Sequence, residues 1–263
     1  MIGAWRRWRE ARTLARRAIP DPLWTTTLAA YPFLGWRSAE DRRRLRELAT
    51  LFIADKEWAG AHGFEVSDAV AVAIAAQACV PVLQLGLAAY AGFKGIVVQP
   101  DAVAARRSRM DEIGVVHEYD EELAGEAMYR GPVMLSWSDV QRAADFEGPV
   151  YNVVIHEFAH VLDMLDGEAD GVPPLPSARE LAHWMEVIEA QWQRFVRRVD
   201  AGEPTLIDPY GAEGRDEFFA VASEAFFVAP REFAAEEPRL HELLQRFYHQ
   251  DPAASYAAYE NGA

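Results

Sequence analysis

Residues 153–163 read Val-Val-Ile-His-Glu-Phe-Ala-His-Val-Leu-Asp, and the rest of the chain is interpreted outward from this predicted helix. Residues four apart lie on the same face of an α-helix, so His156 and His160 would present two imidazole nitrogens to one ion. This H-E-x-x-H spacing is typical of zinc hydrolases. Glu157 would then lie beside the open position of the metal, where a carboxylate can take a proton from zinc-bound water.

The residues around this motif favour a metal over a chance match. Apolar residues flank both histidines, so the helix is expected to be buried. Burying two histidines and a glutamate costs free energy unless a partner stabilises them, and a metal ion is the simplest partner. Asp163, three residues after His160, is expected to orient a ligand imidazole by accepting its second N–H.

A zinc site of this type needs a third protein ligand, and the segment 210–227 offers two candidates. Glu217 and Glu224 are seven residues apart, which places them on one face of a predicted helix with Ala220 and Val221. Phenylalanines surround both acids, so neither is expected to be an ordinary solvated glutamate. One would ligate zinc and the other would support the site, and the spacing does not decide which.

Further segments carry a resemblance to a known family, and it extends over nearly the whole chain. Besides the His156 helix, these segments are Gly63-Phe64-Glu65, Pro81-Val82-Leu83, Gly131 to Trp137, Gly171-Val172-Pro173 and Glu217 to Val221. Together they resemble the Mlc titration factor A family of bacterial zinc peptidases, which is similar to the catalytic domain of anthrax lethal factor. The chief departure is a slightly longer stretch between Asp163 and Tyr210.

The resemblance implies assignments that the spacing leaves open. It places the third zinc ligand at Glu217 and gives Glu224 a role in supporting the helix or the ligands. It also implies that Tyr210, seven residues before the ligand, assists at the metal, where its phenol would donate to the oxyanion formed during hydrolysis. The implied fold is α+β and mainly helical: a zincin-like (gluzincin) metallopeptidase fold with a small mixed β-sheet beside the metal helix.

The motif residues predict zinc-dependent hydrolysis of peptide or amide bonds, and with the resemblance aminopeptidase-like activity is expected. One Zn²⁺ per chain, held by His156, His160 and Glu217, would keep its fourth position for water. Glu157 would take the proton of that water and pass it to the leaving amine. The alternative is a non-catalytic binding protein with a structural zinc. A structural site would use a fourth protein ligand, and none is obvious in the sequence.

The resemblance also implies a protein partner besides the peptide substrate. Members of the family bind and sequester Mlc, a DNA-binding transcriptional repressor of sugar uptake. An Mlc-like repressor is therefore an expected partner of this chain. Direct binding of nucleic acid or of anionic membranes is not expected, because the formal net charge is −15.

Length and composition predict how the chain is organised. With 263 residues, 51% of them hydrophobic, it can bury a sizeable core. We expect a basic N-terminal tail over residues 1–20, a single zincin-like peptidase domain with an N-terminal helical lobe over 21–250, and a mobile C-terminal tail over 251–263. The basic segment is expected to be frayed and solvated in preference to a surface helix, and it lacks the apolar centre of a secretory signal. A cytoplasmic location is expected, and the single cysteine, Cys79, is expected in the core.

Capping residues and apolar periodicity predict three long helices. Ser38 is expected to cap a helix over 40–58, and Ser67 a buried helix over 69–87 with a kink near Pro81. The polar residues and proline within the second run argue against a membrane span. Ser177 is expected to cap a third helix, whose aromatic stripe would support the metal helix from behind.

Two short segments are predicted to be strands. Residues 95–100 form an apolar run that proline closes, and residues 133–137 alternate in polarity. We expect residues 133–137 to lie at the edge of the sheet beside the zinc site, where unpaired backbone groups could bind an extended substrate.

Overall fold

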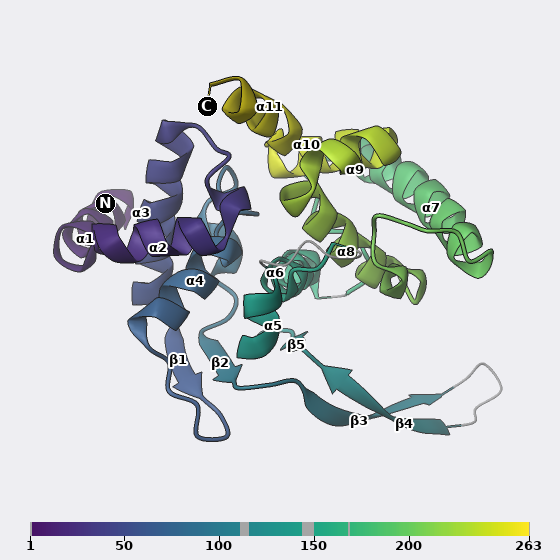
Figure 1. Cartoon of the computed structure of the whole chain (residues 1–263), viewed down its shortest axis with the longest axis horizontal. Helices are drawn as coiled ribbons and strands as arrows, with labels where there is room; N and C mark the ends of the chain where they lie inside the picture. Colours follow the sequence, from purple (N-terminus) through teal and green to yellow (C-terminus); the bar gives the residue numbers. More distant parts are fainter. Residues whose placement is uncertain (1, 111–115, 144–149, 168, 263) are drawn as a thin grey trace.

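The computed structural model describes residues 2–110, 116–143, 150–167 and 169–262. Helices make up most of this part of the chain, and a small sheet lies below them in the view of Figure 1. The α-helices are α1 (Ile2–Arg17), α2 (Asp21–Ala30), α3 (Ala39–Asp55), α4 (Asp68–Ala78), α5 (Trp137–Arg142), α6 (Val153–Asp163), α7 (Ala178–Asp200), α8 (Arg215–Val228), α9 (Pro230–Glu236), α10 (Pro238–Tyr248) and α11 (Pro252–Gly262). Short 3-10 helices include η1 (Pro32–Leu34), η2 (Leu87–Tyr90), η3 (Met164–Asp166) and η4 (Pro209–Ala212). The predicted mainly helical α+β class with a small mixed sheet is confirmed.

The sheet beside α6 is mixed, and its order differs from the prediction. Its described strands run in the order β1 (Glu57–Gly60), β2 (Gly95–Gln99), β6 (Val133–Ser136) and β5 (Gly125–Ala127). β1, β2 and β6 are parallel, and β5 is antiparallel to β6. The prediction that residues 133–137 form the sheet edge is therefore wrong, because β5 covers that side of β6. The edge next to α6 is β5.

A second pair of strands lies outside this sheet. β3 (Val103–Met110) and β4 (Val116–Leu123) form an antiparallel ribbon, with Val103 opposite Leu123. Figure 1 shows this ribbon extending away from the helices. It connects β2 to β5, so its base lies at the sheet edge that faces α6.

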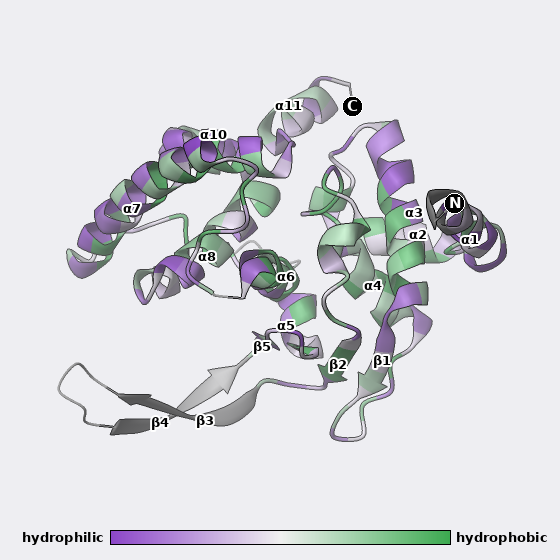
Figure 2. Cartoon of the chain, turned by 180° about the vertical axis from the view of Figure 1, so that it is seen from behind, coloured by the Kyte–Doolittle hydropathy of each residue, from purple (hydrophilic) through white to green (hydrophobic). Residues whose placement is uncertain are grey.

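The hydrophobic core surrounds α4 and the back of α6. Every residue of α4 from Val70 to Ala78 is buried, and Figure 2 shows α4 in the hydrophobic colour while α7 carries many hydrophilic residues. On α6, Phe158 is fully buried and its ring packs 4.9–5.8 Å from the rings of Phe52, Tyr90 and Phe93. This aromatic cluster fixes the position of α6 from the side opposite the histidines.

All three predicted helices start where the capping residues indicated, and the first two, α3 and α4, end earlier than predicted. Ser38 accepts the N–H of Asp41 at the start of α3, and Ser67 accepts the N–H of Val70 at the start of α4. The predicted kinked continuation to residue 87 is wrong, because α4 ends at Ala78 and turns follow. Pro81 has no N–H to donate to the helix ladder, and its ring clashes with the preceding turn. None of the helices in the described ranges is long and apolar enough to cross a membrane.

The third predicted helix, α7, begins after Ser177 as expected. It was expected to pack behind α6, but its main contacts are with other elements. Ser177 Oγ accepts the backbone N–H of Glu180, which completes the predicted cap. The helix contacts α8, α10 and η4. The aromatic stripe of α7 therefore supports the helix that carries Glu217 and Glu224.

Both ends of the described chain are helical. α1 packs on α3, so the segment expected to be frayed forms a surface helix. Arg9 lies over the ring of Trp5 and Arg12 over the ring of Trp8, which are stabilising contacts between residues four apart. Residues 252–262 form α11, which packs on α9.

Candidate metal centre

Helix α6 begins at a buried cap and carries both histidines on one face. Asn152 Oδ1 accepts the N–H of Ile155 at 2.9 Å, and Asn152 Nδ2 donates to Gln77 Oε1 of α4 at 2.8 Å. His156 and His160 follow one turn apart, with ring centroids 4.8 Å from each other. The cap and the aromatic cluster behind the helix hold these two imidazoles toward α8.

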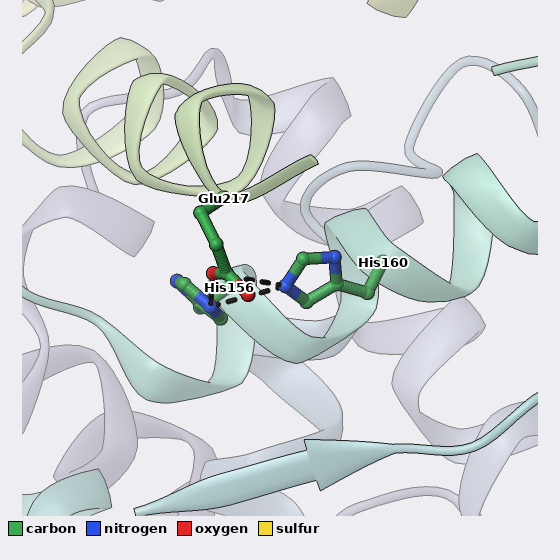
Figure 3. A group of neighbouring side chains, drawn as sticks. All are labelled: His156, His160 and Glu217. Atoms are coloured by element: carbon green, nitrogen blue, oxygen red, sulfur yellow. Dashed lines mark hydrogen bonds and ion pairs between the residues drawn. The ribbon is translucent and has the colours of Figure 1, made fainter. Parts of the chain in front are cut away.

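Helix α8 brings Glu217 to the two imidazoles (Figure 3). Glu217 Oε2 lies 3.1 Å from His156 Nε2 and 3.4 Å from His160 Nε2, and the two Nε2 atoms are 3.2 Å apart. Zinc bonds of about 2.0–2.2 Å at tetrahedral angles would separate neighbouring ligand atoms by roughly 3.3–3.6 Å. Glu217 Oε2 is buried, yet it makes no hydrogen bond to the described residues. The nitrogen and oxygen donors and their separations fit a zinc ion.

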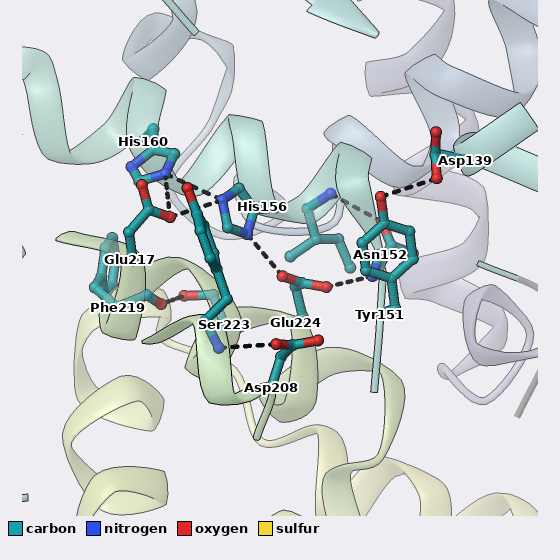
Figure 4. A network of polar contacts seen from close by, with 12 residues as sticks. Asp139, Tyr151, Asn152, His156, His160, Asp208, Glu217, Phe219, Ser223 and Glu224 are labelled. Carbon is teal, nitrogen blue, oxygen red and sulfur yellow. Dashed lines mark hydrogen bonds and ion pairs between the residues drawn. The ribbon is translucent and has the colours of Figure 1, made fainter. Parts of the chain in front are cut away.

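Glu224, about two turns further along α8, makes a different contact. Its Oε1 lies 2.8 Å from His156 Nδ1, the ring nitrogen opposite the one that faces Glu217 (Figure 4). Its Oε2 accepts the backbone N–H of Asn152 at the start of α6. Glu224 is only 1% exposed, so these hydrogen bonds replace the water it has lost. Glu224 thus orients the His156 ring and ties α8 to α6.

Glu157 lies between α6 and the sheet edge. It is 5% exposed, and the backbone N–H of Ala127 on β5 donates to its carboxylate. A Cβ atom built on Gly125 would lie 2.5 Å from Glu157 Oε1. Only glycine at this position therefore allows the backbone of β5 to lie so close to Glu157. Burial raises the pKa of Glu157, and the neighbouring imidazoles offset this in part.

The same close packing perturbs the two groups that meet between α6 and α8. Burial by itself lowers the pKa of His156, but the carboxylates of Glu217 and Glu224 outweigh it and raise that pKa well above 6.5. Burial by itself raises the pKa of Glu217, but the two imidazoles outweigh it and hold that pKa far below its usual range. The site therefore places one carboxylate between two imidazoles. A divalent cation can be coordinated by these three groups together.

Tyr210 lies at the open side of this cluster. It belongs to η4, where Asp208 Oδ1 accepts its backbone N–H at 2.9 Å. Its ring centroid is 6.2 Å from that of His156, and the side chain is 37% exposed. Tyr210, His156 and Glu157 all line a cavity of about 320 Å³ that also reaches Asp139 and Asp208.

Asp163 does not perform the role predicted for it. Its Oδ2 accepts the backbone N–H of Gly171 at 2.8 Å, and its Oδ1 has no hydrogen-bond partner in the described part of the chain. Asp163 is fully buried, and burial raises its pKa to about 7. The prediction that Asp163 orients an imidazole is wrong, because the carboxylate at the ring of His156 belongs to Glu224.

A family model described as glucose-regulated metallo-peptidase M90 matches residues 5–249, a span that contains every residue of the candidate centre. The chain belongs to the M90 metallopeptidase family. The M90 description agrees with the geometry of the site, in which His156, His160 and Glu217 could hold a metal.

Relatives of this M90 chain match it over most of their own length. An uncharacterized protein of Synechocystis is 35% identical over 94% of this chain and 90% of its own. Two proteins named Mlc titration factor A, from Cronobacter sakazakii and Enterobacter sp. strain 638, are 35% and 37% identical. These matches cover 93% and 89% of this chain and 91% and 88% of the relatives. The resemblance inferred from the sequence is confirmed.

Two residues beside the candidate metal centre were not predicted from the sequence to be important for it. Gly125 matters because β5 passes so close to Glu157, and Asn152 because it connects α6 to both α4 and α8. Asn152 directly precedes an apolar helical run, which is a capping signal that could have identified it. Nothing local marks Gly125, since its constraint comes from a residue 32 positions further along the chain.

Proposed function

We propose that this chain is a zinc-dependent peptidase in which His156, His160 and Glu217 hold the metal. The observation that carries the proposal is the triangle of His156 Nε2, His160 Nε2 and Glu217 Oε2, with sides of 3.1–3.4 Å. The buried carboxylate of Glu157 beside it supports a hydrolytic role, and the M90 match supports a metallopeptidase. A structural zinc would need a fourth protein ligand. The metal-holding group found among the described residues contains three.

The chain's own residues supply the proton transfers and the charge stabilisation. Bound zinc would lower the pKa of a coordinated water and polarise the substrate carbonyl. Glu157 takes the proton of the attacking water and returns it to the leaving amine. Its raised pKa brings the carboxylate closer to the range in which it can both accept and release a proton. Tyr210 donates a hydrogen bond to the oxyanion from the open side of the cluster.

The substrate in this proposal is an extended peptide or a short amide, bound along β5. β5 is the edge of the sheet, and it is held against Glu157 through the N–H of Ala127. An edge strand offers backbone groups that pair with an extended chain. Asp208 lines the same cavity as Glu157, so a free α-amino group can pair with its carboxylate there, whereas Asp139 is already engaged by Arg142 and Tyr151. This supports aminopeptidase-like cleavage.

The proposal includes the organisation of the chain. The pair of helices α6 and α8 beside a mixed sheet is compatible with a zincin-like (gluzincin) fold. Residues 21–250 would form the peptidase domain, with residues 1–20 and 251–263 as flanking segments. Activity in the cytoplasm is part of the same proposal.

The first test measures bound zinc by elemental analysis in wild type, Glu217→Ala and Glu224→Ala. We expect about one zinc per chain in wild type, loss of the metal in Glu217→Ala and retention at reduced affinity in Glu224→Ala. Glu157→Gln should keep zinc and lose hydrolysis of a chromogenic alanyl amide, because only the proton acceptor is removed.

Two outcomes would reject the proposal. Wild type that contains no zinc and takes up none on addition would exclude the metal site. Full activity in Glu157→Gln, with zinc bound, would exclude the mechanism. Each variant is compared by circular dichroism, so that loss of the fold is not mistaken for loss of the site.

A second candidate function is the binding of a transcriptional repressor. Relatives that match 89–93% of this chain carry the name Mlc titration factor A. If sequestration is the main role, Glu157→Gln should retain repressor binding although it cannot hydrolyse a peptide. Binding by wild type in the absence of any peptidase activity would make this function the principal one.

A further inference from the structure

A second cavity, of about 720 Å³, lies outside the metal centre. Its walls come from the segment between η1 and the start of α3, from Leu83 and Gln84, and from α11 with the residues that precede it. Figure 1 shows α11 close to the N-terminal helices although the two are far apart in the sequence. None of the three candidate metal ligands lines this cavity, so it is separate from the proposed active site.

One wall of the cavity contains a buried guanidinium group. Arg37 is 7% exposed, and its Nη1 donates to the backbone oxygen of Phe33 at 2.6 Å. Among the described residues, the side chain of Arg37 makes no other hydrogen bond and no ion pair. Burial lowers the pKa of Arg37 to about 10, so the group is charged at neutral pH. The nearby carboxylate of Asp41 offsets only part of the cost of burying this charge, and Arg37 lines a space large enough for a ligand.

The carboxylates near Arg37 are already engaged. Asp41 accepts hydrogen bonds from Ser38 Oγ at 2.8 Å and from Gln84 Nε2 at 3.3 Å. Asp251 accepts the N–H of Ala254 at 2.9 Å and caps α11. Both acids line the cavity, but neither forms an ion pair with Arg37, and Asp41 acts on its guanidinium only through a longer-range charge interaction.

A second arginine adds to the positive charge of this wall. Arg42 Nη1 donates to the backbone oxygens of Gly35 at 3.0 Å and of Arg37 at 2.8 Å. It lines the cavity together with the aromatic residues Phe33, Trp36 and Phe227. The wall therefore combines two guanidinium groups with an apolar surface, which is the usual composition of a small-molecule site.

We propose that this cavity binds a small organic carboxylate, whose anionic group pairs with Arg37 and whose apolar body lies against the aromatic wall. Guanidinium groups bind carboxylates through paired N–H donors. A single negative charge is favoured over a polyphosphate, because Asp41 and Asp251 also line the cavity and the whole chain carries a formal charge of −15. The volume lies within the range of about 300–1,000 Å³ that is typical of ligand sites.

The test uses isothermal titration calorimetry with 2-naphthoate and its neutral counterpart 2-naphthamide. Wild type should bind the carboxylate about tenfold or more tightly than the amide, because only the carboxylate pairs with the guanidinium. Arg37→Gln should weaken naphthoate binding by about tenfold to hundredfold and leave naphthamide binding unchanged. Equal affinity for the two compounds in wild type, or no binding of naphthoate at millimolar concentration, would overturn the proposal.

A matched pair of variants on α11 locates the site without disturbing Arg37. Ala258 and Ala257 are both exposed, but only Ala258 lines the cavity. Ala258→Trp should block naphthoate binding, whereas Ala257→Trp should not. The same weakening in both variants, or in neither, would contradict this location. These binding measurements require no peptidase activity, so their outcome is independent of whether the proposed function is correct.

Discussion

Gly125 is the residue at which the sheet and the proposed catalytic carboxylate come closest. In Gly125→Ala the new methyl group would lie 2.5 Å from Glu157 Oε1, so either Glu157 or β5 must move. We expect kcat/KM for an alanyl amide to fall by about a hundredfold, since displacements near 1 Å have effects of that size. The zinc content should be unchanged, because the three atoms nearest to the new methyl all belong to Glu157, which is not a candidate ligand.

Gly92→Ala provides the control for this substitution. Apart from Gly92 itself and its two chain neighbours, no residue would have an atom within 4 Å of a Cβ atom at Gly92. Its activity should match that of wild type. Equal activity in Gly125→Ala and Gly92→Ala would show that the position of Glu157 is not critical.

Asp163 predicts a pH dependence of stability. Its pKa is raised from an ordinary value of about 3.9 in the unfolded chain to about 7 in the fold. The folded state therefore binds the proton more tightly than the unfolded chain. The contribution of Asp163 to the free energy of unfolding is fully present below pH 4 and is lost as the pH rises through 7. The change is on the order of 2–4 kcal/mol. Asp163→Asn should remove this part of the slope, measured as urea midpoints between pH 4 and 8.

The comparison with wild type isolates Asp163 from the other ionisable groups. Every other carboxylate and histidine is present in both proteins. The stability difference between variant and wild type should therefore change across this pH range in favour of the variant at high pH. A constant difference would mean that Asp163 is ionised in the fold at all these values.

At the scale of elements, Asn152 joins three helices through one side chain and its backbone. It caps α6, donates to Gln77 of α4, and donates its N–H to Glu224 of α8. Asn152→Ala should lower the free energy of unfolding by about 2–4 kcal/mol, because a cap is worth about 1 kcal/mol and an unpaired buried acceptor costs about 1–3 more. Chemical denaturation measures this change.

Ser177→Ala removes an exposed cap of the same kind from α7 and serves as the reference. Ser177 Oγ accepts the N–H of Glu180 but connects no other helix. Its loss should cost only about 1 kcal/mol. If the two variants lose the same stability, the side-chain connection of Asn152 to Gln77 of α4 adds nothing beyond the cap; the backbone contact to Glu224 is retained in both.

The elements that could be predicted from sequence are those with local signals. Ser38, Ser67 and Ser177 each precede an apolar periodic run, and each caps a helix at the expected residue. β5 could not be predicted, because three residues containing a glycine have no periodicity. Its presence made the assignment of residues 133–137 to the sheet edge wrong, since strand order depends on pairing between distant segments.

The candidate site divides in the same way. The helical spacing of His156 and His160 is enough to predict that both imidazoles lie together, and their rings are indeed neighbours. Spacing could not choose between Glu217 and Glu224, because both lie on one face of α8. Which of them meets the Nε2 atoms and which meets Nδ1 depends on how α8 packs on α6, and that is a property of the tertiary fold.

At the scale of the whole molecule, a chelator should reveal how much the metal stabilises the fold. In the proposed centre, zinc would bind the folded chain through residues of both α6 and α8, so at a free concentration one hundred times its Kd it should add about 2.7 kcal/mol of stability. For a chain of this size that corresponds to a Tm shift of about 5–10 °C. Calorimetry with and without the chelator measures it.

His160→Ala is the control for the chelator experiment. It removes one of the three candidate ligands, and its Tm should respond little to the chelator. An identical response in the variant and in wild type would place the stabilising metal elsewhere in the protein.

Glu217, the third candidate ligand, follows the two histidines only after the whole of α7. A chain emerging from the ribosome therefore displays His156 and His160 well before Glu217 exists. During that interval a zinc ion could be coordinated by the two imidazoles but not by a carboxylate from α8. Tight metal binding would require α8 to dock on α6 first, because the loop between the two helices must close before Glu217 can contact the histidines. In the proposed centre, metal uptake would mark the completion of folding, and a partly synthesised chain would lack one of the three candidate ligands.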